Sequence, residues 1–139
     1  MKITVAGTGY VGLVTGTCLA NLGNDVTCLD IDQNIVKTLS GGQLTIYEPG
    51  LEDLFHRNLH KNRLSFSSDI KKVIPGSEII FICVGTPCNE NNEADLGAVS
   101  SLAEEIGTPV LLRIQPIRGE SAQPRKEIRP LDRELRAGQ

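Results

Sequence analysis

The first residues that could do chemistry are six near the amino terminus with the spacing G-x-G-x-x-G: Gly7, Thr8, Gly9, Tyr10, Val11 and Gly12. Such a loop can hold the pyrophosphate of a dinucleotide when it joins a strand to a helix. Gly7 would allow the tight turn, Gly9 the close approach of backbone to pyrophosphate, and Gly12 the close packing of helix on strand. The pyrophosphate would then bind the free N–H groups at the amino end of the helix. The alternative is a turn with a purely structural role.

An acidic residue follows at the distance that a dinucleotide site requires. Asp30 lies 18 residues after Gly12, at the end of the next apolar run. A carboxylate there can accept hydrogen bonds from the hydroxyls of the adenosine ribose. It would also repel a 2′-phosphate, and no arginine follows within the next several residues, so Asp30 favours NAD over NADP. The neighbouring Asp32 is better explained as a solvated loop or helix-capping residue.

A second loop ends the most apolar segment of the chain and consists of Val84, Gly85, Thr86 and Pro87. Ligands of open parallel sheets bind beyond the carboxyl ends of the strands, so this loop is expected to face the same cofactor. Thr86 offers a hydroxyl and a backbone N–H, and Pro87 fixes the path of the chain. An ordinary strand-ending turn is the alternative.

The four cysteines do not follow a zinc-binding spacing, and we expect no metal site. Cys18, Cys28 and Cys83 fall in expected helices or strands, where a free cysteine usually acts as a small buried apolar residue. Cys88 falls in a loop and could be an accessible thiol.

The elements that must position these residues alternate between two periodicities. Continuous apolar runs predict strands, and apolar residues at helical spacing predict helices. The expected strands are Lys2–Ala6, Asp25–Ile31, Leu64–Ser67 and Glu78–Val84; the expected helices are Val11–Leu22, Gln33–Leu39, Leu51–His60, Ile70–Val73 with Asp69 as its cap, and Leu96–Ile106. Strands alternating with helices predict an α/β fold with a Rossmann-type parallel sheet and helices on both faces, and we expect this fold to be incomplete here.

The composition changes near Gly107. Residues 1–107 carry seven Lys and Arg against thirteen Asp and Glu, whereas residues 108–139 carry seven against four, with four of the seven prolines. We expect a Rossmann domain over residues 1–107 and a disordered tail over 108–139, in which residues 109–114 could be a fragment of strand. The tail has no aromatic residues among its arginines, so nucleic-acid binding is not expected. No apolar run approaches the ~20 residues that span a bilayer, and no secretory signal opens the chain, which indicates a cytoplasmic protein without membrane contact.

Several segments together resemble the N-terminal, NAD-binding domain of the UDP-glucose 6-dehydrogenase family. They are MKITVAGTGYVGLVTGTCLANLG, DVTCLDID, IYEPGLEDL, FICVGTP and EADL, and the resemblance runs from Met1 to about Gly107. The segments around Tyr47–Leu51 and Ala94–Leu96 are the more specific ones for the UDP-glucose branch. Members of this family oxidise UDP-glucose to UDP-glucuronate with two NAD in two hydride transfers.

The resemblance implies that NAD contacts residues 7–12, Asp30 and residues 84–88, with Val11 and Thr86 among them. One position departs from the family pattern. Where the family often has Lys or Arg near the adenosine ribose, five residues after the acid, this chain has Ile35. One cofactor contact is therefore expected to be missing.

Other features that the resemblance implies do not occur in these 139 residues: a Ser-Thr-Val-Pro segment, a later Gly-Gly-x-Cys segment whose cysteine forms a thioester, the family's lysine in that later region, and the sugar-nucleotide domain. We therefore expect this chain to lack activity alone, and the change at Gly107 to mark a shifted reading frame or a damaged gene end. The alternatives are a stand-alone NAD-binding or sensing module, a subunit completed by a separate chain, and an inactive pseudogene product.

Overall fold

The computed structural model describes residues 1–88 and 94–113, with the backbone alone for residues 108–113. Its elements in chain order are β1 (Lys2–Ala6), α1 (Tyr10–Asn21), β2 (Asp25–Leu29), α2 (Gln33–Ser40), α3 (Leu51–His60), β3 (Leu64–Ser67), α4 (Ile70–Val73), the 3-10 turn η1 (Ile74–Gly76), β4 (Ile79–Ile82) and α5 (Gly97–Arg113). Asp69 caps α4 as expected, because its side chain accepts a hydrogen bond from the Lys72 N–H at 3.2 Å.

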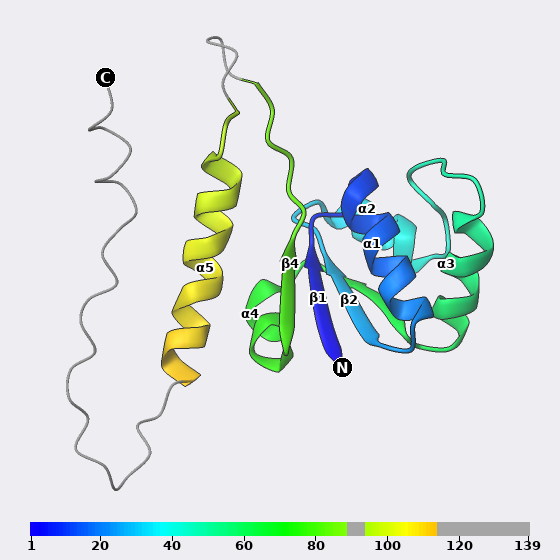
Figure 1. Cartoon of the computed structure of the whole chain (residues 1–139), viewed down its shortest axis with the longest axis horizontal. Helices are drawn as coiled ribbons and strands as arrows, with labels where there is room; N and C mark the ends of the chain where they lie inside the picture. Colours follow the sequence, from blue (N-terminus) through cyan, green and yellow to red (C-terminus); the bar gives the residue numbers. More distant parts are fainter. Residues whose placement is uncertain (89–93, 114–139) are drawn as a thin grey trace, which may run out of the picture.

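The four strands form one parallel sheet in the order β3-β2-β1-β4. β1 lies in the middle, so the chain moves outward to β3 and then crosses back to place β4 on the other side of β1 (Figure 1). This reversal is the switch point of a doubly wound sheet. The predicted α/β Rossmann-type fold is confirmed.

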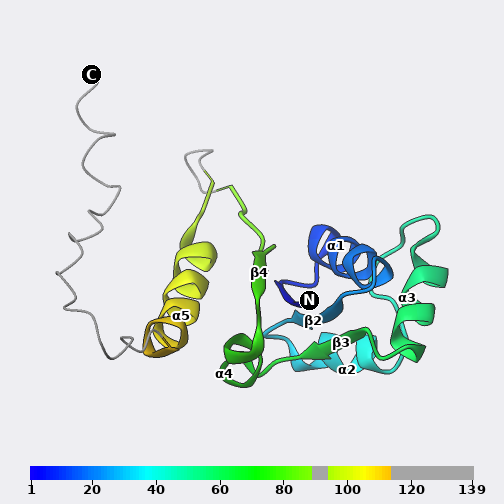
Figure 2. The same ribbon diagram turned by 60° about the horizontal axis from the view of Figure 1, so that its bottom comes forward.

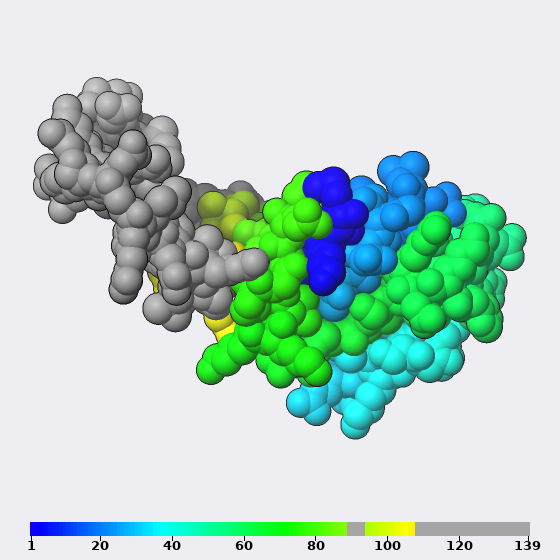
Figure 3. Space-filling view, turned by 90° about the horizontal axis from the view of Figure 1, so that it is seen from below, coloured from blue at the N-terminus to red at the C-terminus, as the bar shows by residue number. Residues whose placement is uncertain are grey.

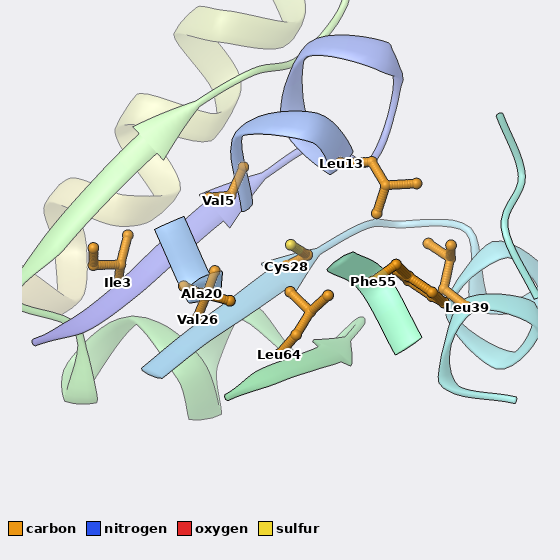
Figure 4. Close-up of a cluster of buried hydrophobic side chains, with 9 residues drawn as sticks. All are labelled: Ile3, Val5, Leu13, Ala20, Val26, Cys28, Leu39, Phe55 and Leu64. Atoms are coloured by element: carbon orange, nitrogen blue, oxygen red, sulfur yellow. The ribbon is translucent and has the colours of Figure 1, made fainter. Parts of the chain in front are cut away.

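One face of the sheet carries the main core, in which apolar residues from alternate strand positions meet α1, α2 and α3. Figure 4 shows how side chains from these separate elements converge on Cys28 in β2. The nine buried members are Ile3, Val5, Leu13, Ala20, Val26, Cys28, Leu39, Phe55 and Leu64. Burial of this apolar area is the main term that holds the helices on the sheet.

A smaller core lies on the opposite face. Ala6, Leu29 and Ile74 are buried there, and Leu102 and Ile106 of α5 pack against them. Figure 2 shows α4 and α5 on the side of the sheet away from α1. The helices therefore divide between the two faces, as a right-handed crossover at the switch point requires.

The same face is polar over β1, β2 and β3. Thr4 bonds to Ser77 at 2.5 Å and Thr27 bonds to Ser65 at 3.0 Å, and both pairs line a hollow of about 470 Å³. The hollow begins at the amino ends of β1 and β2, the side seen in Figure 3, where the N-terminal residues lie at the surface in dark blue. It shares no residue with the glycine loop, and its hydroxyl groups already have partners: Thr4 pairs with Ser77, Thr27 pairs with Ser65, and Ser67 accepts a hydrogen bond from the Asp69 N–H.

Two expectations about the strands were wrong. β2 ends at Leu29, and Ile31 is 98% exposed, because the chain leaves the sheet at Asp30 to start α2. β4 is limited to Ile79–Ile82. The expected placement of helices on both faces is confirmed; β4 is the last of the described strands on its side of the sheet, and its Phe81 is 37% exposed.

The last helix also differs from expectation. α5 continues through Gly107 to Arg113, so residues 109–113 are helical and not a fragment of strand. Pro109 lies inside this helix, where its missing N–H removes one backbone hydrogen bond. The expected boundary at residue 107 therefore falls within a helix. The remainder of the expected tail, residues 114–139, lies outside the described residues. Within the described ranges no helix is long and apolar enough to cross a membrane.

Candidate functional site

The glycine loop joins β1 to α1 at the carboxyl edge of the sheet. Gly7 has φ of 103°, in the left-handed region that favours glycine. An added Cβ at Gly7 would lie 2.6 Å from the carbonyl oxygen of Cys83. The backbone after β1 and the backbone after β4 therefore touch at this point.

The three glycines of the loop have different surroundings. An added Cβ at Gly12 would lie 1.8 Å from the carbonyl oxygen of Gly7, so the first turn of α1 packs directly on the loop backbone. An added Cβ at Gly9 would meet no atom within 4 Å. The space over Gly9 is thus open, whereas Gly7 and Gly12 are closed by the protein itself.

The amino end of α1 is not capped by a side chain. Gly9 is its N-cap and provides no side-chain cap, and no acidic residue lies in the first turn. The first N–H groups of a helix have no partner within the helix, and the dipole adds positive potential there. Tyr10 and Val11, on this first turn, are 60% and 68% exposed.

Asp30 connects the ends of β1 and β2. Its Oδ2 accepts hydrogen bonds from the N–H of Thr8 at 3.0 Å and from the Thr8 hydroxyl, and its Oδ1 accepts one from the Asp32 N–H at 3.0 Å. Thr8 is only 3% exposed, and Asp30 is partly buried. The carboxylate is held in one orientation beside the glycine loop.

Asp32 has the structural role that was expected of it. Its side chain accepts a hydrogen bond from the Asn34 N–H at 2.8 Å and caps α2. Ile35, one turn further on, packs against the main core. The position where the family often has a basic residue therefore serves the core here.

The second loop follows β4 at the same edge of the sheet. Val84 is partly buried, and Gly85, Thr86 and Pro87 are exposed. The Pro87 carbonyl accepts a hydrogen bond from the Asp95 N–H at 2.8 Å, and Cys88 forms a bridge with Ala94. Since β1 and β4 are neighbours, this loop and the glycine loop lie side by side.

The cysteines differ from one another in accessibility. Cys28 is buried and Cys88 exposed, but Cys18, expected to be buried in its helix, is exposed as well. Burial, with a smaller effect from the nearby Cys83, raises the pKa of the Cys28 thiol to about 12. Burial also raises the pKa of Cys83. Both of these thiols therefore remain protonated and unreactive near neutral pH.

Two features of the site were not found in the sequence. One is the pair of bonds between Thr8 and Asp30, which are 22 residues apart. The other is the contact of Gly7 with the backbone of Cys83, which only the pairing of β1 with β4 creates. The one sequence signal for this contact was that Cys83 directly precedes Val84, the first residue of the expected second loop.

Comparisons with known proteins agree with this geometry. Residues 1–126 match the model of the UDP-glucose/GDP-mannose dehydrogenase family, NAD binding domain. The UDP-glucose 6-dehydrogenase TuaD of Bacillus subtilis is 52% identical over 106 residues, which are 76% of this chain and 23% of that protein.

Solved structures show the same fold. A GDP-mannose dehydrogenase from Pseudomonas aeruginosa superposes with a TM-score of 0.79 at 36% identity, over 83% of this chain and 26% of that one. A UDP-glucose dehydrogenase from Pyrobaculum islandicum gives 0.75 at 38% identity, over 78% and 25%. The chain thus spans about a quarter of the length of the relatives it matches.

Proposed function

The chain belongs to the UDP-glucose/GDP-mannose dehydrogenase family and carries its NAD-binding domain, and from this premise we propose that it is the NAD-binding portion of a UDP-glucose 6-dehydrogenase. The whole enzyme would convert UDP-glucose to UDP-glucuronate with two NAD. The 139 residues alone would bind NAD without oxidising the sugar nucleotide. The observation that carries the proposal is the open space over Gly9 beside the fixed carboxylate of Asp30.

Two observations favour the UDP-glucose branch over the GDP-mannose branch. Identity is 52% over 106 residues to the Bacillus UDP-glucose enzyme and 39% over 107 residues to the GDP-mannose 6-dehydrogenase of Pseudomonas aeruginosa. The segments Tyr47–Leu51 and Ala94–Leu96 also resemble the UDP-glucose branch.

The pyrophosphate of NAD would bind at the amino end of α1. The free N–H groups of the first turn would donate to its oxygens, and Gly9 would leave room for them because no side chain occupies that space. Exposed Tyr10 and Val11 flank this position. The loop of Val84–Pro87, beside Gly7, would line the adjoining part of the cofactor.

The adenosine ribose would bind to Asp30. An ionised carboxylate accepts about four hydrogen bonds through its two oxygens. Thr8 and Asp32 use three of these positions, which leaves one on Oδ1. A ribose hydroxyl can take that position, and a second can bind if the Thr8 hydroxyl rotates away. The 2′-phosphate of NADP would instead meet a negative charge, and Ile35, packed in the core, offers no positive one.

The sugar oxidation would need groups beyond this site. NAD supplies the hydride acceptor when it is bound, but hydride transfer requires the substrate carbon to be held within about 3–3.5 Å of it. The described residues build the cofactor side of that arrangement. Exposed Cys88 lies in the cofactor loop, and its surroundings do not match the Gly-Gly-x-Cys segment of the family.

Calorimetric titration with NAD and with NADP tests the proposal. NAD should bind more tightly, and Asp30→Asn should weaken NAD binding by about 1–3 kcal/mol, the range for a hydrogen bond to a charged group. Asp32→Asn is the matched control, since Asp32 caps α2 and should leave NAD affinity unchanged. Equal affinity for the two cofactors, or equal effects of the two variants, would contradict the role of Asp30.

A further inference from the structure

Thr8 is buried although the glycine loop around it is open. It follows β1, and Asp30 follows β2, the neighbouring strand in Figure 1. Only 3% of Thr8 is exposed, whereas Gly9 and Tyr10, the next two residues, are exposed at the amino end of α1. Both donors of Thr8, the N–H and the hydroxyl, bond to Oδ2 of Asp30. Thr8 therefore has no donor left for a bound cofactor.

The orientation of the Asp30 carboxylate depends on these bonds. The backbone of Asp30 is held separately, because its N–H donates to the Ser67 carbonyl at 3.1 Å. The side chain has no such support from a cation: among the residues whose side chains the structure describes, no lysine or arginine forms an ion pair with Asp30. Its three hydrogen bonds come from neutral donors, two on Thr8 and one on the Asp32 N–H.

We propose that Thr8 is a positioning residue that sets the preference for NAD over NADP by holding the Asp30 carboxylate toward the adenosine ribose. This inference rests on the proposed function of the site. A carboxylate held beside the ribose accepts hydrogen bonds from its hydroxyls and repels a 2′-phosphate at the same position. A carboxylate that is free to turn away does both less well. Thr8 thus acts on the cofactor through Asp30 and not by direct contact.

The size of the effect follows from the side-chain torsions of Asp30. The first torsion of the side chain has three staggered positions, so a carboxylate that turns freely takes the productive one about a third of the time. Apparent affinity falls in proportion to the fraction of molecules that are competent to bind, so free turning costs about threefold in NAD affinity. Turning also moves the negative charge away from the 2′-phosphate of NADP, so the two cofactors respond differently.

Thr8→Val isolates the hydroxyl bond. Valine has the shape of threonine and keeps the backbone bond to Oδ2, but it places a methyl group where the hydroxyl lies. That position on the carboxylate is then covered and not opened to the ribose, and the apolar contact favours turning of the carboxylate toward water. Thr8→Ser keeps the hydroxyl. Thr17→Val is the matched control, because Thr17 is also buried and its hydroxyl has no hydrogen-bond partner within the described part of the chain.

Calorimetric titration of these variants with NAD and with NADP tests the proposal. Thr8→Val should weaken NAD binding about threefold and leave NADP binding unchanged or tighter, so the preference for NAD falls. A general disturbance of the loop would weaken both cofactors alike, because both carry the same pyrophosphate. Thr8→Ser and Thr17→Val should keep the original preference. In an Asp30→Ala background, Thr8→Val should have no further effect on NAD affinity, whereas a direct contact of Thr8 with NAD would give additive losses.

Hydrogen exchange of the unliganded variants provides a measurement that does not require cofactor binding. If the carboxylate turns away in Thr8→Val, the Asp32 amide loses its acceptor and should exchange faster than in Thr8→Ser or Thr17→Val. Unchanged exchange at Asp32, or an unchanged preference for NAD in folded Thr8→Val, would overturn the proposal. So would a loss of the preference in Thr8→Ser. If the original chain does not bind NAD, or Asp30→Ala binds it equally well, the proposed function fails and the role of Thr8 in selectivity fails with it.

Discussion

Exchanging single glycines for alanine separates the two functions of the glycine loop. At Gly9 an added methyl group meets no protein atom within 4 Å, and φ of −71° with ψ of −168° is an ordinary extended conformation. At Gly12 the same methyl group would lie 1.8 Å from the Gly7 carbonyl oxygen. The two variants therefore make the same chemical change in opposite surroundings.

The expected effects on stability differ accordingly. Gly9→Ala should lower the free energy of unfolding by less than about 1 kcal/mol, since alanine is the poorer N-cap. Gly12→Ala should lower it by about 1–3 kcal/mol or more, because backbone must move to admit the methyl group. The gain in helix propensity from alanine, about 1 kcal/mol, offsets only part of this cost.

Gly9→Ala should have a large effect on NAD binding although its effect on stability is small. The methyl group of Gly9→Ala enters the space proposed for the pyrophosphate, so affinity for NAD should fall at least about tenfold, or 1.4 kcal/mol. Urea unfolding followed by circular dichroism gives the first quantity, and calorimetric titration gives the second. The reasoning is refuted if Gly9→Ala binds NAD as the original chain does, or if it unfolds as easily as Gly12→Ala.

Two further predictions concern the thiols. No NADH should form when the purified chain is given UDP-glucose and saturating NAD, and turnover that Cys88→Ser abolishes would show that Cys88 takes part in catalysis after all. The pKa of Cys28 is raised from 9.0 to about 12 by burial, so the stability that its neutral thiol contributes is complete below pH 9 and is lost as pH rises toward 12. Cys28→Ala should therefore show a smaller alkaline loss of melting temperature than Cys88→Ser, and equal losses would contradict that assignment.

Local pattern was sufficient for most of the elements. Residues 51–60, 64–67 and 70–73 were predicted with the bounds that the structure gives, because apolar patterns, and caps such as Asp69 before residue 70, act over a few neighbouring residues. The pattern failed where a long apolar run continued past the end of its strand, as at Ile31 and Val84. Chain direction and pairing decide those ends, and a single segment does not contain that information.

The glycine spacing, the position of Asp30 and the alternation of strands and helices were fixed by the sequence itself, and with them the Rossmann-type fold. Only the tertiary structure decided that Gly9 is open while Gly12 is closed, since that depends on where the Gly7 carbonyl lies. It also decided that Thr8 holds Asp30, that Ile35 packs against the core, and that Phe81 is 37% exposed. These properties arise from contacts between residues far apart in the chain. The type of a residue and its spacing from its neighbours do not specify such contacts.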